Sequence, residues 1–238
     1  QDEGWYLYAA NLVAEGKTLY RDFFFTQGPG MPTIYRSFTW VWGAWGLLGA
    51  RVLTLLLGAA GILLATGLAR HLAPEGRKGE AALAAFLLLG CNLYHLYYVA
   101  IPKTYALAGL FVILGFYLLT VAAERRKRIA VGAGLSLAFA AGTRISLGLL
   151  LPVVGASLIL ARRWRMLIGF CLGGFLGLAL VYGPFLLDER ALSGLVAAQR
   201  YHAARGGFDL VWTVGSLSRL VRWYLPVFVV LGLGVAAF

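Results

Sequence analysis

Charged residues are scarce in this chain. Only 13% of its 238 residues are Asp, Glu, Lys or Arg, which is about half of the ~25% found in soluble globular domains. Hydrophobic residues make up 61%, and the mean hydropathy is +0.79. A chain with so little charge is expected to meet lipid rather than water over much of its surface, so we predict an integral membrane protein.

Cysteine and histidine are also rare, which limits the possible chemistry. Cys91 and Cys171 lie inside apolar runs. They indicate neither a disulfide framework nor a metal site, and we expect both to be small buried residues. The three histidines, His71, His95 and His202, lack helical metal spacing. No nucleotide loop or Ser/His/Asp array is evident, and the pI of about 10.0 is attributed to membrane topology, not to nucleic-acid binding.

Long apolar runs divide the chain into membrane spans and loops. A helix that rises about 1.5 Å per residue needs roughly 20 apolar residues to cross ~30 Å of hydrocarbon. We expect the protein to continue with helices beyond both ends of this sequence. Runs of sufficient length predict four spans and a truncated fifth: Arg51–Leu72, Glu80–Ala100, Lys103–Ala123, Met166–Leu187 and Leu220–Phe238.

The stretch Ile129–Ala161 is too long for one span and short for two. Thr143-Arg144-Ile145-Ser146 lies in its middle, and both flanks are basic. Two short helices that meet at Arg144 would return the chain to the side from which it came, and we prefer this arrangement. A single long tilted helix is the alternative.

Lysine and arginine are concentrated in residues 70–80, 124–128 and 162–165. These segments hold ten of the 21 basic residues, and short loops rich in Lys and Arg normally face the cytoplasm. We therefore predict that these segments face the cytoplasm. The expected location is the bacterial inner (plasma) membrane, with the active face extracytoplasmic. The predicted layout is an extracytoplasmic segment at 1–50, a bundle of about six spans, two of them short, at 51–187, an extracytoplasmic loop at 188–219 and a truncated helix at 220–238.

Two short helices are predicted within residues 1–50. Asp2 is a good N-cap and Gly16 a good C-terminal stop for the first helix. The second, Met31–Trp45, is followed by Gly46, which releases the chain into the next span. Both helices are rich in Trp and Tyr and too short to cross, so we expect them in the headgroup layer.

The extracytoplasmic side carries more cations than the orientation rule expects. Snorkelling to lipid headgroups explains them one by one, whereas a shared anionic ligand such as a lipid phosphate would explain several together. The residues are Lys17, Arg21, Arg36, Arg51, Lys103, Arg144, Arg190, Arg200, Arg205, Arg219 and Arg222.

The first fifty residues combine an acidic pair, a Tyr-x-Asp element and a Gln-x-Pro turn followed by a tyrosine. This pattern resembles the GT-C glycosyltransferases, polytopic enzymes that use polyprenyl-phosphate sugars and include protein O-mannosyltransferases and the lipid A aminoarabinose transferase. The resemblance implies an all-helical GT-C-like fold and sugar transfer to a glycan, lipid or protein acceptor. The matching positions are Asp2-Glu3, Tyr6, Ala10, Gly16, Tyr20-x-Asp22, Gln27-x-Pro29, Tyr35, Gly46 and Arg51.

In that family a carboxylate of the first outer loop binds or deprotonates the acceptor. The resemblance assigns this catalytic role to Asp2, with Glu3 in support, and it allows a divalent cation shared by Asp2 and Asp22. Helix capping by Asp2 and helix-dipole complementarity for Glu3 are the structural alternatives. Residues 101–105 lack the second carboxylate that family members often carry in the next outer loop.

Cations and polar aromatics are the candidates for phosphate and sugar contacts. Arg144 is predicted to grip the donor phosphate through its planar fork of donors, with an ion pair to an outer carboxylate as the alternative. Tyr94, Tyr97, Tyr98 and Tyr105 form either an interfacial belt or a sugar-binding wall. The predicted binding residues are Asp22, Gln27, Tyr35, Lys103, Tyr105, Arg144, Arg200 and His202.

Two further patterns concern structure. Ala191–Arg205 is predicted to be an amphipathic interfacial helix, with a lid over the site as the alternative. Gly169, Gly173 and Gly177 share one face of a predicted span, a pattern that allows close approach of a second helix.

Together these observations favour an all-helical polytopic membrane glycosyltransferase. The alternatives are a non-catalytic subunit of a larger membrane complex that keeps a GT-C-like fold and, less strongly, a transporter. The expected partners are a polyprenyl-phosphate-linked sugar, its acceptor and membrane lipids. The enzyme hypothesis also predicts that Asp2 and Arg144 share one cavity.

Overall fold

The computed structural model of the chain describes residues 3–205, 214–219, 221–222 and 225. It divides into two units, Gln1–Gln199 and Arg200–Phe238. Among the described residues the regular structure is helical, as predicted, and the only strand-like pairing is an isolated bridge between Leu19 and Phe23. The predicted helix 220–238 lies largely outside the described residues.

The first helix, α1 (Glu3–Ala14), ends at a glycine, as the sequence predicts. Gly16 has φ +86, a left-handed conformation that is free of strain only for glycine. Its amide donates to the Val13 carbonyl at 3.1 Å. The Lys17 amide donates to the Leu12 carbonyl at 2.9 Å. These two bonds form a Schellman motif, which satisfies carbonyls at the helix end.

The predicted helix Met31–Trp45 is divided in the structure. α2 (Gly30–Tyr35) is followed by a 3₁₀ turn at Arg36–Phe38, and α3 (Thr39–Leu72) begins directly after it. Gly46 interrupts α3 with φ 57 and ψ −151, a combination essentially restricted to glycine. The chain therefore changes direction at Gly46, the predicted junction.

The predicted span Glu80–Ala100 is bent. Its two parts, α4 (Lys78–Gly90) and α5 (Leu93–Ala100), meet at 67°. Asn92 caps the start of α5, because its side-chain oxygen accepts the His95 amide at 3.0 Å. The structure thus replaces one predicted helix by two, and the cap is the reason the second one begins here.

The predicted pair of short helices around Arg144 is confirmed. α7 (Ala130–Thr143) ends at Arg144, whose backbone is extended (φ −139, ψ 107). A 3₁₀ turn at Ile145–Leu149 then leads into α8 (Leu150–Leu160). The alternative, a single long helix, is wrong because the Arg144 backbone is not helical.

Membrane-length helices are present. α6 (Thr104–Glu124) and α9 (Trp164–Leu186) lie close to two predicted spans. Together with Gly30–Leu72 they are the three described stretches long and apolar enough to cross a membrane, and the bent pair α4–α5 would make a fourth. This set is compatible with an integral membrane protein.

The prediction that the cysteines are buried is wrong. Cys91 and Cys171 are both exposed and unpaired. Large apolar side chains are exposed as well, for example Leu160 at 84% and Phe175 at 76%. Lipid tails are as apolar as a protein core, so an apolar run in the sequence does not distinguish a core-facing residue from one on the outside of the bundle.

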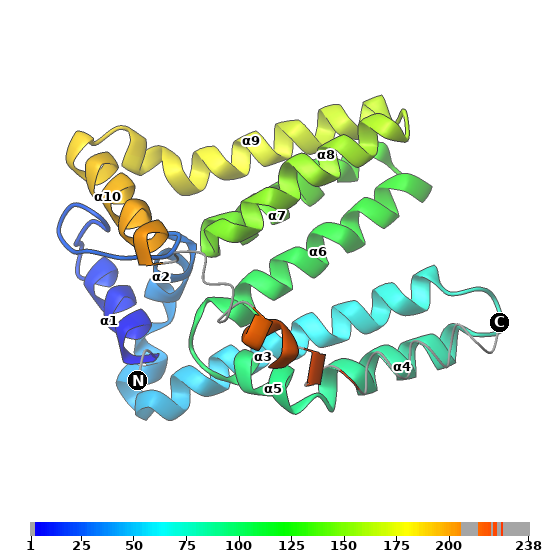
Figure 1. Cartoon of the computed structure of the whole chain (residues 1–238), viewed down its shortest axis with the longest axis horizontal. Coiled ribbons are helices and arrows are strands. Elements are labelled where there is room, and N and C mark those ends of the chain that lie inside the picture. The colour runs from blue at the N-terminus through cyan, green and yellow to red at the C-terminus, as the bar shows by residue number, and fades with distance from the viewer. Residues whose placement is uncertain (1–2, 206–213, 220, 223–224, 226–238) are drawn as a thin grey trace. The chain divides into compact units, whose positions relative to one another are not determined.

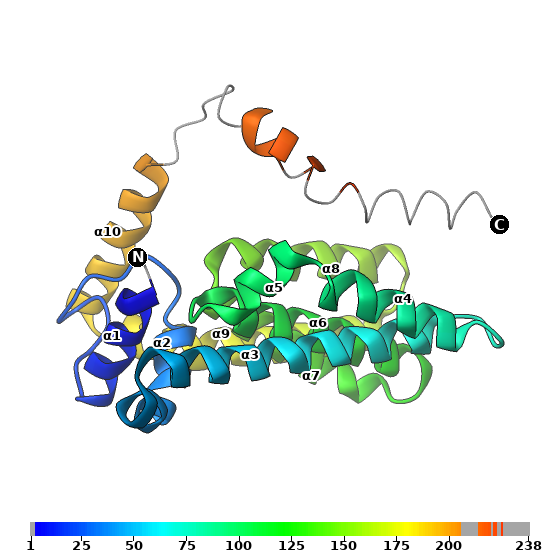
Figure 2. The same cartoon turned by 90° about the horizontal axis from the view of Figure 1, so that it is seen from below.

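The basic segments gather at one end of the bundle. Figures 1 and 2 show the α3–α4, α6–α7 and α8–α9 connections at the right-hand end. We call this the basic end. At the opposite, N-terminal end lie α1, α2 and the first part of α10 (Glu189–Arg205). The basic connections are thus separated from the N-terminal elements, and the side of a membrane that each end faces stays a prediction. α10 confirms the helix predicted at 191–205.

α7 and α9 approach each other through glycines. A Cβ on Gly173 would lie 1.8 Å from the Val131 carbonyl oxygen, and one on Gly177 would lie 2.5 Å from an α7 side chain. On the facing helix, a Cβ on Gly134 would lie 2.0 Å from the Phe170 carbonyl oxygen. Only glycine fits at these distances, so the predicted packing role of the glycine pattern is confirmed and α7 is its partner.

Gly173→Ala is expected to destabilise the protein by about 1–3 kcal/mol, because the added methyl group forces α7 and α9 apart. Gly183→Ala on the same helix is the control, since a Cβ there would meet nothing within 4 Å. Thermal unfolding of the purified protein in detergent measures both. Equal melting temperatures for the two variants would contradict a close α7–α9 contact.

Candidate functional site

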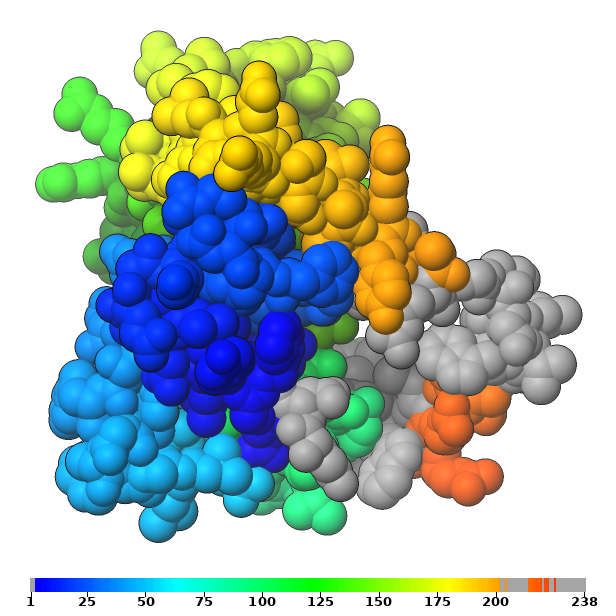
Figure 3. All heavy atoms as spheres, turned by 90° about the vertical axis from the view of Figure 1, so that its left-hand side faces the viewer, coloured from blue at the N-terminus to red at the C-terminus, as the bar shows by residue number. Residues whose placement is uncertain are grey.

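The N-terminal end carries most of the residues that the sequence assigns to a site. Figure 3 faces this end, where α1 and the following loop (blue), the start of α3 (light blue) and the first part of α10 (gold) form the surface. Polar side chains at this end fall into two groups. Some join these elements to one another, and others line cavities.

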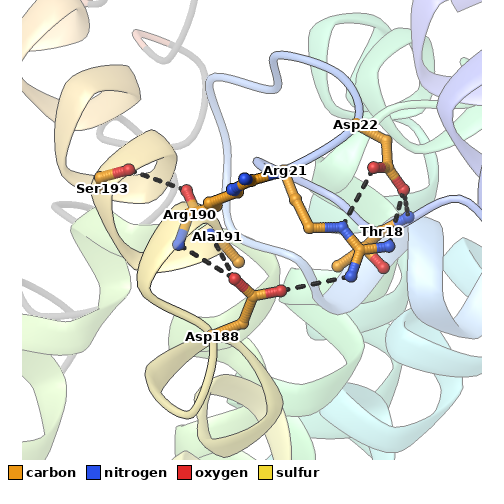
Figure 4. A network of polar contacts seen from close by, with 7 residues as sticks. All are labelled: Thr18, Arg21, Asp22, Asp188, Arg190, Ala191 and Ser193. Atoms are coloured by element: carbon orange, nitrogen blue, oxygen red, sulfur yellow. Dashed lines mark hydrogen bonds and ion pairs between the residues drawn. The ribbon is translucent and has the colours of Figure 1, made fainter.

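Arg21 ties the loop after α1 to the start of α10 (Figure 4). Its guanidinium donates to both carboxylate oxygens of Asp22, at 3.0 and 3.1 Å, and to Asp188 at 3.3 Å. Asp22 also accepts the Thr18 amide at 2.7 Å, and Asp188 accepts two amides of the first turn of α10. Both oxygens of Asp22 thus accept hydrogen bonds within the protein, and its predicted role as a substrate or metal ligand stays a prediction.

These contacts lower the pKa of both carboxyl groups. The Arg21 hydrogen bonds, followed by the Thr18 amide, stabilise the ionised form of Asp22 and lower its pKa from 3.8 to about 2. The Ala191 amide is the first cause of a lowered pKa at Asp188. Both carboxylates are therefore charged at neutral pH and hold the loop on α10.

Low pH is expected to weaken the contact between the loop after α1 and the start of α10. A carboxyl group whose pKa is lower in the folded state contributes stability fully above its ordinary pKa of 3.8, and that contribution is lost as the pH falls through about 2. Cleavage by pepsin within the loop 15–29 should therefore accelerate between about pH 4 and 2. Asp22→Asn should be cleaved faster than wild type above that window and depend less on pH. A wild-type cleavage rate that does not rise relative to Asp22→Asn would contradict the ion pair's role.

Tyr20 gives the same loop its shape. Its φ of 68 lies in the left-handed region, which is rare for bulky residues. The ring is buried and packs edge-on against Phe185, with centroids 5.4 Å apart. The hydroxyl donates to the Gln27 carbonyl at 2.6 Å, and burial raises the pKa of Tyr20. Gln27 thus contributes its backbone to the structure of the loop.

The Gln-x-Pro turn packs directly on the end of α7. A Cβ on Gly28 would lie 2.0 Å from the Gly142 carbonyl oxygen. A Cβ on Gly30 would lie 2.9 Å from the Thr143 nitrogen. Backbone therefore meets backbone immediately before Arg144. The turn therefore supports the end of the helix that precedes Arg144, and the predicted substrate contact of the Gln27 side chain stays a prediction.

Glu3 is paired with Arg51. Two nitrogens of the guanidinium donate to the two carboxylate oxygens at 3.0 and 3.1 Å, which joins α1 to α3. Tyr35 is fully buried, and its hydroxyl lies 3.0 Å from that of Thr54. Tyr35 is thus part of the core in this structure, and its predicted substrate contact stays a prediction. Asp2, the predicted base, lies outside the described residues.

Arg144 has no carboxylate partner among the residues that the structure describes. Its guanidinium carbon lies 4.6 Å from the centroid of the Tyr105 ring, and its Nε lies 3.4 Å from the Ser146 hydroxyl. The alternative prediction, an ion pair with an outer carboxylate, is thus not formed there. Most of the guanidinium donors remain open to an anion.

Tyr105 begins a row of tyrosines beside Arg144. Tyr98 lies 4.7 Å from Tyr105 between ring centroids, and its other neighbours are Tyr94 at 4.8 Å and Tyr97 at 5.3 Å. The row runs along α5 to the first turn of α6. The structure therefore brings the predicted tyrosine wall together with two predicted binding residues.

Arg144 and Tyr105 line a cavity of about 400 Å³. The remaining walls come mainly from α3, α5 and α6 and are mostly apolar, including Gly58 and Ile62, whereas His95 adds a polar group. A cavity of this volume is large enough for part of a lipid chain. A cation, aromatic hydroxyls and apolar walls in one place suit an amphiphile with an anionic head.

A second cavity, of about 410 Å³, lies between the end of α1, α2 and the ends of α7 and α9. Lys17 and Arg36 line it, together with Phe139 and Pro184. The sequence identified both cations only as part of a general excess. Their shared cavity was not predicted, because its walls come from elements far apart in the chain.

Lys103 immediately precedes α6 and does not line the cavity beside Arg144. Arg200 belongs to the second unit. The side chain of His202 lies outside the described residues, as does Asp2. The common cavity of Asp2 and Arg144 therefore stays a prediction. Within the described part of the chain no group of three His, Cys, Asp or Glu residues could hold a metal ion, and a cation at Asp2 stays a prediction as well.

Comparisons with known proteins add no relative. No protein-family model, no curated protein and no solved structure matches the chain. The geometry around Arg144 is therefore the basis for inferring a function.

Proposed function

We propose that this protein binds a phosphorylated lipid in the cavity beside Arg144 and is a membrane glycosyltransferase of the GT-C type. The donor is a sugar linked to polyprenyl phosphate, and the acceptor is a glycan, a lipid or a protein on the extracytoplasmic side. The motif pattern of the first fifty residues supports the reaction class. The cavity supports the class of donor.

One observation carries the proposal: a guanidinium group lies on the wall of an apolar cavity. A charged side chain next to hydrocarbon is costly unless it is paired. The described partners of Arg144 are only the Tyr105 ring and the Ser146 hydroxyl. A phosphate with a hydrocarbon tail satisfies both parts of the site, since phosphate oxygens match the donor fork and the tail covers the apolar walls.

Sugar transfer breaks the bond between the anomeric carbon and the phosphate oxygen. An acceptor hydroxyl forms the new bond to that carbon and gives its proton to a base, and the electron pair of the broken bond leaves with the lipid phosphate. Arg144 stabilises the charge that grows on this phosphate. Asp2 is the proposed base, because Glu3 and Asp22 are held in ion pairs.

Arg144→Gln is expected to weaken binding of a polyprenyl phosphate by about 10- to 100-fold, since hydrogen bonds to charged groups contribute about 1.5–3 kcal/mol. Native mass spectrometry of the purified protein, titrated with the lipid in detergent, measures the affinity. Arg36→Gln is the matched control, because Arg36 is an arginine of the same end that lines the other cavity. It should change the affinity by less than about twofold. Equal affinities of the two variants would overturn the proposed site.

The tail part of the cavity is tested in the same assay. Gly109 lines the cavity, and a Cβ there would meet nothing within 4 Å. Gly109→Leu should therefore weaken binding of the long lipid and spare a short isoprenyl phosphate. Gly67→Leu on α3 is the control, since Gly67 is equally open but does not line the cavity.

Catalysis is tested by incubating the full-length protein with a panel of polyprenyl-phosphate sugars and acceptors. Loss of a general base lowers turnover by about 10²- to 10⁴-fold. Asp2→Asn is therefore expected to reduce turnover by that factor while lipid affinity stays unchanged. Turnover indistinguishable from wild type would remove Asp2 from the mechanism.

A non-catalytic subunit of a larger membrane complex is the second candidate. It is favoured by the engagement of Glu3 with Arg51 and of Asp22 with Arg21, which leaves neither carboxylate free for proton transfer. Such a protein would bind the lipid through Arg144 without converting it. Absence of turnover across the donor panel, with Arg144-dependent binding intact, would favour this candidate over the enzyme.

A further inference from the structure

The basic end holds a cluster of charge that the proposed function does not use. A cavity of about 490 Å³ is lined by Lys127 from the α6–α7 connection, by Arg162 and Arg163 from the α8–α9 connection and by Arg165 in the first turn of α9. Trp164, 56% exposed, lies among them. Two connections far apart in the sequence therefore direct cations into one hollow.

This charge is not compensated by the protein. None of the four cations has a carboxylate partner in the part of the chain that the structure describes, and no acidic residue lines the cavity. Glu124, three residues before Lys127, is engaged with His71 at 2.7 Å. The arginines Arg21 and Arg51 at the N-terminal end, by contrast, are both paired with carboxylates. The cavity thus has the electrostatics of an anion site.

The backbone at Arg162 adds an independent observation. α8 ends in the same Schellman pattern as α1: the Arg162 amide donates to Ile159 and the Arg163 amide to Leu158, both at 2.9 Å. The left-handed position of this motif favours glycine, and α1 has Gly16 there. In α8 an arginine occupies it with φ 54. A strained arginine where glycine would be relaxed points to a role for its side chain.

Apolar surface adjoins the cations. Leu160 at the end of α8 is 84% exposed, and Ile168 in the second turn of α9 is 60% exposed. The end of α8 and the first two turns of α9 thus bring guanidinium groups, an indole ring and aliphatic side chains close together. A bilayer likewise presents phosphates, an interface that favours Trp and apolar acyl chains next to one another.

We infer that this cavity binds the phosphate headgroup of an anionic membrane phospholipid, with the acyl chains lying along the exposed apolar residues of α8 and α9. The phosphate oxygens accept hydrogen bonds from the arginines of one connection and from the lysine of the other. Basic pockets between membrane helices are suited to such headgroups. The inference is independent of the sugar-transfer proposal and requires only that the apolar helices lie in a bilayer.

The experiment titrates the purified protein in a neutral detergent with phosphatidylglycerol and reads binding by native mass spectrometry. The triple variant Arg162→Gly/Arg163→Gln/Arg165→Gln is expected to bind about 100-fold more weakly than wild type. The matched variant Arg125→Gln/Arg126→Gln/Arg128→Gln removes three exposed arginines from the same end that do not line the cavity. It should lose no more than about fivefold, because exposed charges that do not converge on a cavity pair only weakly with a single headgroup.

Two comparisons decide the result. Equal losses in the two triple variants would overturn the proposal, because they would show attraction to surface charge alone. Glycerol phosphate, which has the headgroup chemistry without acyl chains, should bind far more weakly than the lipid. Binding as tight as that of phosphatidylglycerol would mean a site for a soluble phosphate, and the lipid assignment would be wrong.

Arg162→Gly alone separates folding from binding. Glycine relieves the left-handed backbone, so this variant should unfold at no lower temperature than wild type in the absence of lipid. It should nevertheless bind phosphatidylglycerol about fivefold more weakly. Unchanged lipid affinity in this stable variant would remove Arg162 from the site and would contradict the inference drawn from its conformation.

Discussion

The position of Arg144 depends on backbone-to-backbone contact along α7. Gly173 and Gly177 let α9 approach this helix more closely than any side chain allows, and Gly28 lets the Gln-x-Pro turn do the same at its end. Contacts of this kind are short and leave little room for displacement. Arg144 follows the end of α7 directly in extended conformation, with its guanidinium over Tyr105. The glycines at these contacts, which have no side chain, therefore determine where the Arg144 side chain can lie.

The arginines of the bundle fall into two groups, those paired with carboxylates and those without a described carboxylate partner. At the N-terminal end, Arg21 and Arg51 are neutralised by carboxylates and join separate elements. Arg144 lies at the same end without a described carboxylate and faces an apolar cavity. At the basic end, Arg162, Arg163 and Arg165 likewise have no carboxylate partner among the described residues. Because an unpaired charge beside hydrocarbon is costly, these two places are where an anionic ligand lowers the free energy most.

Two residues with left-handed backbone, Tyr20 and Arg162, differ in the same way: one is stabilised within the protein, and the other is not. Tyr20, with φ 68, is compensated within the protein, since its ring is buried and its hydroxyl is bonded to Gln27. Arg162, with φ 54, has an exposed side chain and no described carboxylate to compensate it. Strain of similar kind thus serves loop structure in one case and, in our proposal, ligand binding in the other.

The sequence by itself determined the helical class, the membrane-length helices α6 and α9, the Gly16 stop, the Gly46 junction and the break at Arg144. These follow from hydropathy and from the backbone freedom of glycine, which are local properties. Only the tertiary structure decided which charged side chains form ion pairs and which remain available to a ligand. Glu3 and Tyr35 look alike as motif residues whether they meet substrate or not, and their partners Arg51 and Thr54 become visible only when distant segments pack together. The same holds for Asp188, the second partner of Arg21, which lies 167 residues further along the chain. Pairing is a property of the folded chain, so the sequence could place Arg144 between two helices but could not show that it lines a cavity with Tyr105.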